Sequence, residues 1–367
     1  MKDFEQKAKQ TNKGIKFDPY IISGIIVGVV LAQNYSYFNV FMLIIFFVTF
    51  LLLAVPDLVA CAVGLIVAKL SGYRLNRFVG YIFVIEQKNA GLNLKISPRW
   101  VSPTMTFYPI EKKIGSVKTV MVAVFNIVTY VLGTILSFVL YGLTKNVVFL
   151  SLVMVFSVAA LQSSILPISD NCQNSWAFIR EILHHEERAI VHNNICLINH
   201  LNSTGTRFRD MDDELFEEFD LDTLGERLFF ANQTSRFLYF SDCDQFEKAL
   251  AISDSLINSH TLQNLSVHRG SLRMDRVLYS LLLGIVNEQV SLDYNHEDSK
   301  AFREAYKYKS CVSVVNYAYA LLYEKDEAKA EEYIKSFNEL VNKTPKLRAE
   351  REKEVIVMIG EQSNKRK

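Results

Sequence analysis

The sequence predicts an all-α membrane protein with about four transmembrane helices, a membrane-proximal β-hairpin loop and a helical cytoplasmic domain. Long uncharged runs lie almost entirely between residues 20 and 166, and several exceed the length typical of helices in a soluble core. The rest of the chain has the alternating charges of a soluble protein. The 367 residues include 25 Phe and 17 Tyr, which excludes intrinsic disorder.

The uncharged runs predict spans at residues 19–33, 38–71, 119–143 and 147–167. The second run carries one acidic residue near its middle, Asp57, directly after Pro56. At 1.5 Å per residue this run exceeds the roughly 30 Å hydrocarbon core. It therefore forms either one helix kinked at the proline or two spans with a turn there.

The distribution of basic residues favours a single kinked pass. The N-terminal segment 1–18 and the loop 72–118 are both rich in Lys and Arg, and the positive-inside rule places both in the cytoplasm. An even number of crossings must then separate them. The prediction is a multi-pass protein of the cell membrane with a transmembrane domain over 19–170 and cytoplasmic N- and C-termini.

The basic loop has a pattern typical of a β-hairpin. The β-prone runs Tyr81–Ile85 and Leu92–Ile96 flank the turn residues Asn89-Ala-Gly91. We expect the hairpin to lie near the membrane surface, with Trp100 among its interfacial anchors.

Residues 171–367 show one amphipathic helix after another. Asp222, Asp242 and Asp326 each stand where a side chain can cap a following helix. Ala249 and Ala330 are small enough to let two helices approach closely. These pairs resemble degenerate tetratricopeptide units without the 34-residue period. Such layers either offer a groove to a peptide or partner protein, or only position the membrane part.

The order of these parts resembles the site-2 protease family of intramembrane zinc metallopeptidases. One span precedes a long helix that ends in Lys69-Leu-Ser-Gly-Tyr73, and a basic β-like loop follows. A hairpin of spans comes next, with Ile165-Leu-Pro167 near its inner end. The stretch from Gly205 to Phe216 is similar to a segment of a bacterial branch of that family that has a helical tail.

The resemblance implies a zinc ion, held by an H-E-x-x-H motif on the long helix and by an Asn-Asp-Gly-type motif further on. Counted back from the Gly-Tyr ending, the first motif falls on Ala60, Cys61 and Gly64, and Ser175 replaces the third ligand. These residues lack the imidazoles that hold zinc and the Glu that activates water. No His precedes His184. The sequence therefore predicts a pseudoprotease with no cofactor and no catalytic residues.

Four polar residues remain as candidates for binding. Asp57 and Cys61 are four apart on one helix face, and Asp170 and Asn174 lie at the inner end of the last predicted span. A carboxylate inside a membrane is costly and is by default a functional hypothesis. Asp57 either bonds to backbone groups freed at the proline, contacts a polar substrate, or belongs to a replacement metal site.

Other chemistry is poorly represented. His184, His185, His192 and His200 lie in a predicted helix over 175–201, but their spacing is too wide for a zinc site within that helix. The five cysteines form no C-x-x-C pair, which is typical of reduced thiols. The chain has no phosphate-binding loop, and the soluble half has no basic stripe to bind nucleic acid.

The sequence thus predicts a catalytically inactive, site-2-protease-like membrane protein that binds a peptide or a transmembrane partner. Its expected partners are the lipid bilayer and a peptide or membrane protein, in a role accessory to peptide processing, export or immunity. The alternative is an active intramembrane metallopeptidase with a non-standard metal site.

Overall fold

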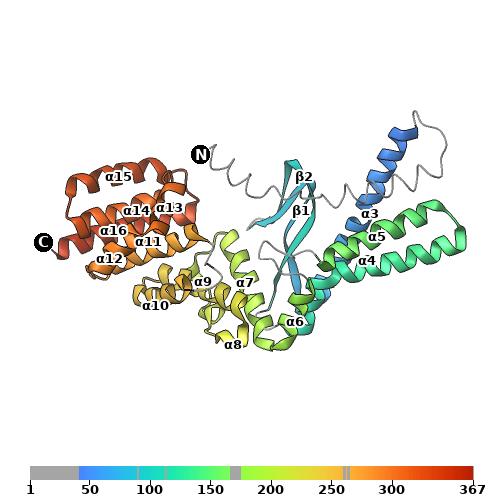
Figure 1. The fold of residues 1–367 in the computed structure, drawn as a ribbon, viewed down its shortest axis with the longest axis horizontal. Coiled ribbons are helices and arrows are strands. Elements are labelled where there is room, and N and C mark those ends of the chain that lie inside the picture. Colours follow the sequence, from blue (N-terminus) through green and yellow to red (C-terminus); the bar gives the residue numbers. More distant parts are fainter. Residues whose placement is uncertain are drawn as a thin grey trace. The chain divides into compact units, whose positions relative to one another are not determined.

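The computed structural model describes residues 41–88, 91–111, 114–165, 175–258, 262 and 265–366. The chain forms two compact units that divide between Ala189 and Ile190. We call them unit 1 and unit 2 (Figure 1). The predicted N-terminal segment 1–18 and the predicted span 19–33 lie outside the described residues.

Unit 1 contains four described helices and a two-stranded sheet. Its elements are α3 (Phe41–Leu70), β1 (Tyr73–Lys88), β2 (Gly91–Pro109), α4 (Ser116–Thr144), α5 (Val147–Ile165) and α6 (Ser175–His184). Helix α3 runs unbroken through Pro56, so the second predicted run forms one helix and not two. A helix break follows His184, where the sequence predicted continuous helix.

The prediction of about four transmembrane helices is wrong. Within the described residues, α4 is the one helix long and apolar enough to cross a membrane. The apolar part of α5, Val147–Leu161, rises only about 22 Å, short of the roughly 30 Å hydrocarbon core. The rest of the described chain is mostly helical with a small antiparallel sheet, which is the hairpin.

The hairpin is present in the predicted loop, but its strands are far longer than the predicted runs, with 16 and 19 residues. The strands extend back to the end of α3, where Gly72 adopts a φ of +84° that favours glycine. The Ile110 N–H donates to the Gly72 carbonyl at 2.9 Å. The Tyr73 hydroxyl lies 3.0 Å from that of Thr119 in α4. The start of β1 and the end of β2 are therefore held together, close to α4.

Close contacts between helices build the core of unit 1. Ala60, Phe125, Tyr130 and Phe156 form a buried cluster that joins α3, α4 and α5. Gly133 of α4 faces the ring of Phe156 so closely that a Cβ there would lie 2.4 Å from the ring. A small residue at such a position lets the backbone of one helix contact a side chain of its neighbour. This kind of close packing is common between helices in membranes.

Unit 2 is a stack of helices around a large apolar core. Helix α7 (Glu186–Ser203) crosses the division between the units, and two 3₁₀ turns, η1 (Phe208–Asp210) and η2 (Asp213–Phe216), follow it. The remaining helices are α8 (Leu221–Leu224), α9 (Glu226–Asp242), α10 (Phe246–Ile257), α11 (Ser266–Leu282), α12 (Glu288–Asn295), α13 (Glu297–Ala305), α14 (Ser310–Ala318), the π-helical η4 (Tyr319–Glu324), α15 (Glu327–Val341) and α16 (Lys346–Lys365).

The predicted helix caps are confirmed at one position of three. The Asp326 carboxylate accepts from the Lys329 N–H at 2.9 Å and caps α15. Helix α9 begins instead after Gly225, and Asp222 lies inside α8. Asp242 does not cap α10, because it is the last residue of α9 and an ion-pair partner. The predicted small residues at the two helix pairs are both buried.

Candidate functional site

The positions that correspond to the zinc motif lie on α3 and face the core of unit 1. Ala60 is 2% exposed and packs in the cluster with Phe125. Cys61 is partly exposed and is a free thiol. Groups of three or more His, Cys, Asp or Glu side chains that could hold a metal do not occur in the described part of the chain.

Gly64, the second of the two histidine positions implied by the resemblance, is covered by side chains from two other elements. A Cβ at Gly64 would lie 2.4 Å from Cε2 of Phe125 and 2.8 Å from Cε of Met105. The Phe125 ring is itself held edge-on by Phe107, with ring centroids 6.1 Å apart. The space that an imidazole would need is therefore filled by apolar side chains of α4 and β2.

Asp57 has a partner inside unit 1. The Tyr130 hydroxyl of α4 donates to Oδ1 of Asp57 at 3.1 Å. A carboxylate in an apolar setting is stabilised by such a donor, so this bond links α3 to α4 beside Pro56. This side-chain donor was not among the alternatives that the sequence left open for Asp57, and those alternatives stay predictions.

The other candidate residues are not brought to this place by the described structure. Asp170 and Asn174 lie outside the described residues. Ser175 is the first residue of α6, and its side chain is not described. The four binding candidates therefore remain predictions.

Three of the four histidines that the sequence placed in one helix have described side-chain neighbours. His184 and His185 stack with ring centroids 4.6 Å apart at the end of α6. In α7 the Cys196 Sγ lies 3.7 Å from Nε2 of His192. Burial, assisted by the charge of Arg227, lowers the pKa of His192 to about 4, and burial raises the pKa of Cys196 to about 11. This pair is neutral near pH 7 and holds no activated thiolate.

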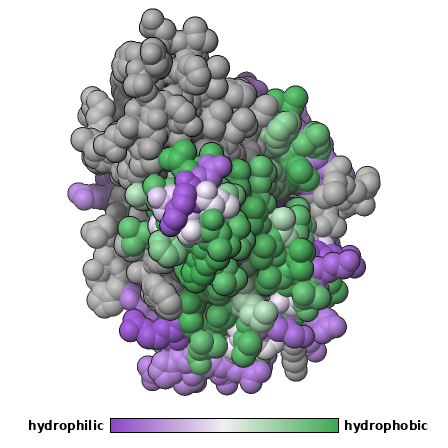
Figure 2. Space-filling view, turned by 90° about the vertical axis from the view of Figure 1, so that its right-hand side faces the viewer, coloured by the Kyte–Doolittle hydropathy of each residue, from purple (hydrophilic) through white to green (hydrophobic). Residues whose placement is uncertain are grey.

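An apolar surface covers much of unit 1. Exposed large side chains follow α4, among them Leu136 at 61%, Phe138 at 64% and Leu143 at 77%. Figure 2 views the side on which α4 and α5 lie in Figure 1 and shows a broad hydrophobic area there. Large contiguous apolar patches of this kind mark membrane or protein contacts.

The stretch from Gly205 to Phe216 has a structural role in unit 2. The Arg207 guanidinium binds Oδ1 of Asp242 at 2.5 Å and Oε1 of Glu354 at 2.6 Å. Arg209 reaches the same glutamate, and Arg351 adds a further contact to the aspartate at 3.7 Å. We call these five residues the Arg207 network. It fastens the segment to the last residue of α9 and to the middle of α16.

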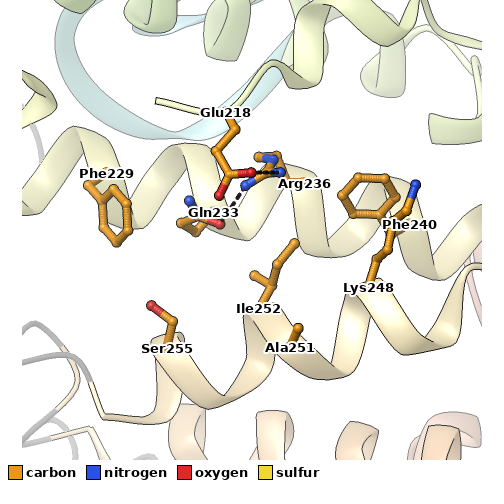
Figure 3. A pocket seen from close by; sticks show the side chains of 9 residues that line it. All are labelled: Glu218, Phe229, Gln233, Arg236, Phe240, Lys248, Ala251, Ile252 and Ser255. Atoms are coloured by element: carbon orange, nitrogen blue, oxygen red, sulfur yellow. Dashed lines mark hydrogen bonds and ion pairs between the residues drawn. The ribbon is translucent and has the colours of Figure 1, made fainter. Parts of the chain in front are cut away.

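Unit 2 also has a pocket of about 510 Å³ between α9 and α10. It contains one buried arginine, Arg236, and one exposed lysine, Lys248, beside apolar side chains. Sequence reasoning missed this pocket, although a guanidinium and an amide on an otherwise apolar helix face were visible as a signal. Figure 3 shows how its side chains lie.

Comparison with known proteins adds no relative, since no family model, no curated protein and no solved structure matches the chain.

Proposed function

We propose that this chain is a non-catalytic membrane protein whose unit 1 is a metal-free, site-2-protease-like scaffold that enters the bilayer. One observation carries the proposal. The two helix positions where the resemblance expects zinc-binding imidazoles, Ala60 and Gly64, are packed against Phe125 and Met105. A hydrolytic zinc site needs an open coordination position for water, and this packing leaves none there.

The membrane part of the proposal rests on the surface of α4. The leucine, valine and phenylalanine side chains along it are exposed and are not covered by the rest of unit 1. Burying them in lipid would remove a large apolar area from water. The role that fits both features is to hold a partner at the membrane without cutting it, as an accessory to peptide processing, export or immunity.

Zinc content tests the catalytic half of the proposal. The full chain, expressed in zinc-supplemented cells and purified in detergent, is expected to contain substoichiometric zinc. It is also expected to leave a single-span peptide uncut. Stoichiometric zinc that is lost in both Asp57→Asn and Cys61→Ser would overturn the proposal and favour the alternative, an active metallopeptidase with a non-standard site.

Alkaline extraction tests the membrane half. We expect the full chain to stay with the membrane pellet, whereas a peripheral protein is released. The variant Leu136→Lys with Phe138→Lys places two charges on the exposed face of α4, and we expect less of it to remain in the pellet because a charge at the bilayer centre is costly. Lys335→Glu, an exposed change in unit 2, is the matched control. Release of the unaltered chain would refute membrane insertion.

A further inference from the structure

The pocket of unit 2 is a groove between two antiparallel helix faces. One wall is a stripe along α9 and the other a stripe along α10, and Glu218 stands at the rim (Figure 3). The lining residues are Phe229, Gln233, Arg236 and Phe240 of α9, and Lys248, Ala251, Ile252 and Ser255 of α10. From the first to the last of its α9 residues the groove rises about 16 Å, the length of about five extended residues.

Arg236 lies in this groove with spare bonding capacity. Its side chain is 10% exposed, and Nη1 donates to Oε1 of Gln233 at 3.1 Å. Nη2 donates to Glu218 at 2.7 Å. The Nε–H is buried and has no hydrogen-bond partner among the described residues. A buried donor without a partner carries a desolvation cost that a ligand oxygen would relieve.

Glu218 holds Arg236 from an exposed position. Its side chain is 67% exposed, and the hydrogen bond from Arg236 lowers the pKa of Glu218, which therefore remains a carboxylate at neutral pH. The backbone before it is fixed, since Asn232 Nδ2 donates to the Glu217 carbonyl at 3.1 Å. Arg236 is buried, but Glu218 reaches it from the solvent side, so a second carboxylate from outside can replace this one on the guanidinium without leaving the buried cation unpaired.

A second cation stands further along the groove. The Lys248 ammonium lies 5.1 Å from the centre of the Phe240 ring, and the Arg236 guanidinium lies 5.7 Å from the same ring. Carboxylates of the described chain form no ion pair with Lys248, which is exposed. The groove therefore has two cations, one weakly held carboxylate and apolar walls at Phe229 and Ile252.

We propose that this groove binds an acidic, extended peptide segment of a partner protein. One carboxylate of the peptide displaces Glu218 from Arg236, a second pairs with Lys248, and an apolar side chain between them contacts Ile252. The planar guanidinium matches a carboxylate through two parallel bonds. The elongated shape and the apolar walls favour a peptide over a compact anion. This inference concerns unit 2 and does not depend on the state of unit 1.

The probe is a fluorescein-labelled peptide, Glu-Leu-Glu-Leu-Glu, titrated with the full chain in detergent and followed by fluorescence polarisation. We expect it to bind at least about tenfold more tightly than Gln-Leu-Gln-Leu-Gln, the difference that about 1.4 kcal/mol produces. Equal affinity for the two peptides would overturn the proposal. Displacement of the acidic peptide by an equal concentration of inorganic phosphate would also overturn it, because a plain anion site would then suffice.

Variants separate recognition from folding. Lys248→Met changes an exposed residue and is expected to weaken binding of the acidic peptide, whereas Lys335→Met, a remote exposed lysine, is not. Glu218→Ala removes the competing carboxylate and is expected to tighten binding by about fivefold or more, since about 1 kcal/mol of competition gives fivefold. A merely structural pair between Glu218 and Arg236 would give unchanged or weaker binding in that variant, and this result would refute the displacement step.

Discussion

Replacing Arg207 by methionine is expected to loosen unit 2 by about 2–3 kcal/mol. The guanidinium bridges two carboxylates, Asp242 and Glu354, that lie 112 residues apart in the chain, and its own side chain is 13% exposed. Breaking a buried ion pair costs about 3–5 kcal/mol. The cost is smaller here because Glu354 is 37% exposed and because Arg209 and Arg351 remain within 4 Å of the aspartate.

Hydrogen exchange of the full chain in detergent is the suitable assay, because it resolves the helices separately. We expect amides of α9 and α16 to exchange about 30- to 150-fold faster in Arg207→Met, the range that 2–3 kcal/mol produces. Amides of α4 in unit 1 should not change. Lys335→Met, which breaks an exposed pair with Glu331, should cost less than about 1 kcal/mol.

The same network predicts a pH dependence. Hydrogen bonds and charge from Arg207 lower the pKa of Glu354 from 4.5 to about 2. Burial alone would raise the pKa of Asp242, but bonds from Arg207 and the Arg209 N–H lower it overall. The contribution of Glu354 is therefore complete above about pH 4.5 and is lost as the pH falls towards 2. Equal rates of amide exchange in α9 and α16 of Arg207→Met and of the unaltered chain at pH 7 would refute the predicted loss of about 2–3 kcal/mol.

Three further outcomes are expected. Gly64→Ala should destabilise unit 1 by about 1–3 kcal/mol through overpacking, whereas Gly142→Ala, which meets nothing within 4 Å, should stabilise it by up to about 1 kcal/mol. Thermal unfolding in detergent measures both changes. A Gly64→Ala variant that is more stable than Gly142→Ala would contradict the packing at Gly64. Tyr130→Phe and Asp57→Asn should be coupled by at least about 0.5 kcal/mol in a double-mutant cycle, and additive effects would exclude their hydrogen bond. Burial lowers the pKa of His192 from 6.5 to about 4, so its contribution to the stability of unit 2 should be complete above about pH 6.5 and decline towards pH 4. The variant His192→Gln should show a smaller decline. An equal decline of stability with pH in the variant and the unaltered chain would contradict this role of His192.

The sequence predicted features that depend on residues close together in the chain, such as the hairpin and the cap at Asp326. The turn residues at 89–91 predicted a hairpin, because Asn and Gly between two β-prone runs favour a tight turn. Its length was not predictable, since the strands extend to Tyr73, which is fixed by a hydroxyl contact with Thr119, 46 residues away. Asp326 caps its helix as expected because no distant partner competes for it among the described residues.

Long-range partners explain the predictions that failed. Asp242 has the residue type and spacing of a helix cap, but Arg207, 35 positions earlier, binds it instead. The groove of unit 2 was missed for a similar reason. Gln233 and Arg236 look like solvated positions of an amphipathic helix, and only the packing of α9 on α10 makes them buried walls. The predicted span 147–167 was too long, because a run of apolar residues does not fix where the apolar part of a helix ends, here at Leu161.

The Arg207 network also sets an order on synthesis. Glu354 follows Arg207 by 147 residues, and a ribosome adds about 5–20 residues per second, so roughly 7 to 30 s separate the two. Until Glu354 is made, Asp242 is the one carboxylate of the Arg207 network that the chain can supply, and the lining residues of the groove, which end at Ser255, are all synthesised before it. Unit 2 therefore lacks the contact between α9 and α16 for as long as the last part of the chain is still being made.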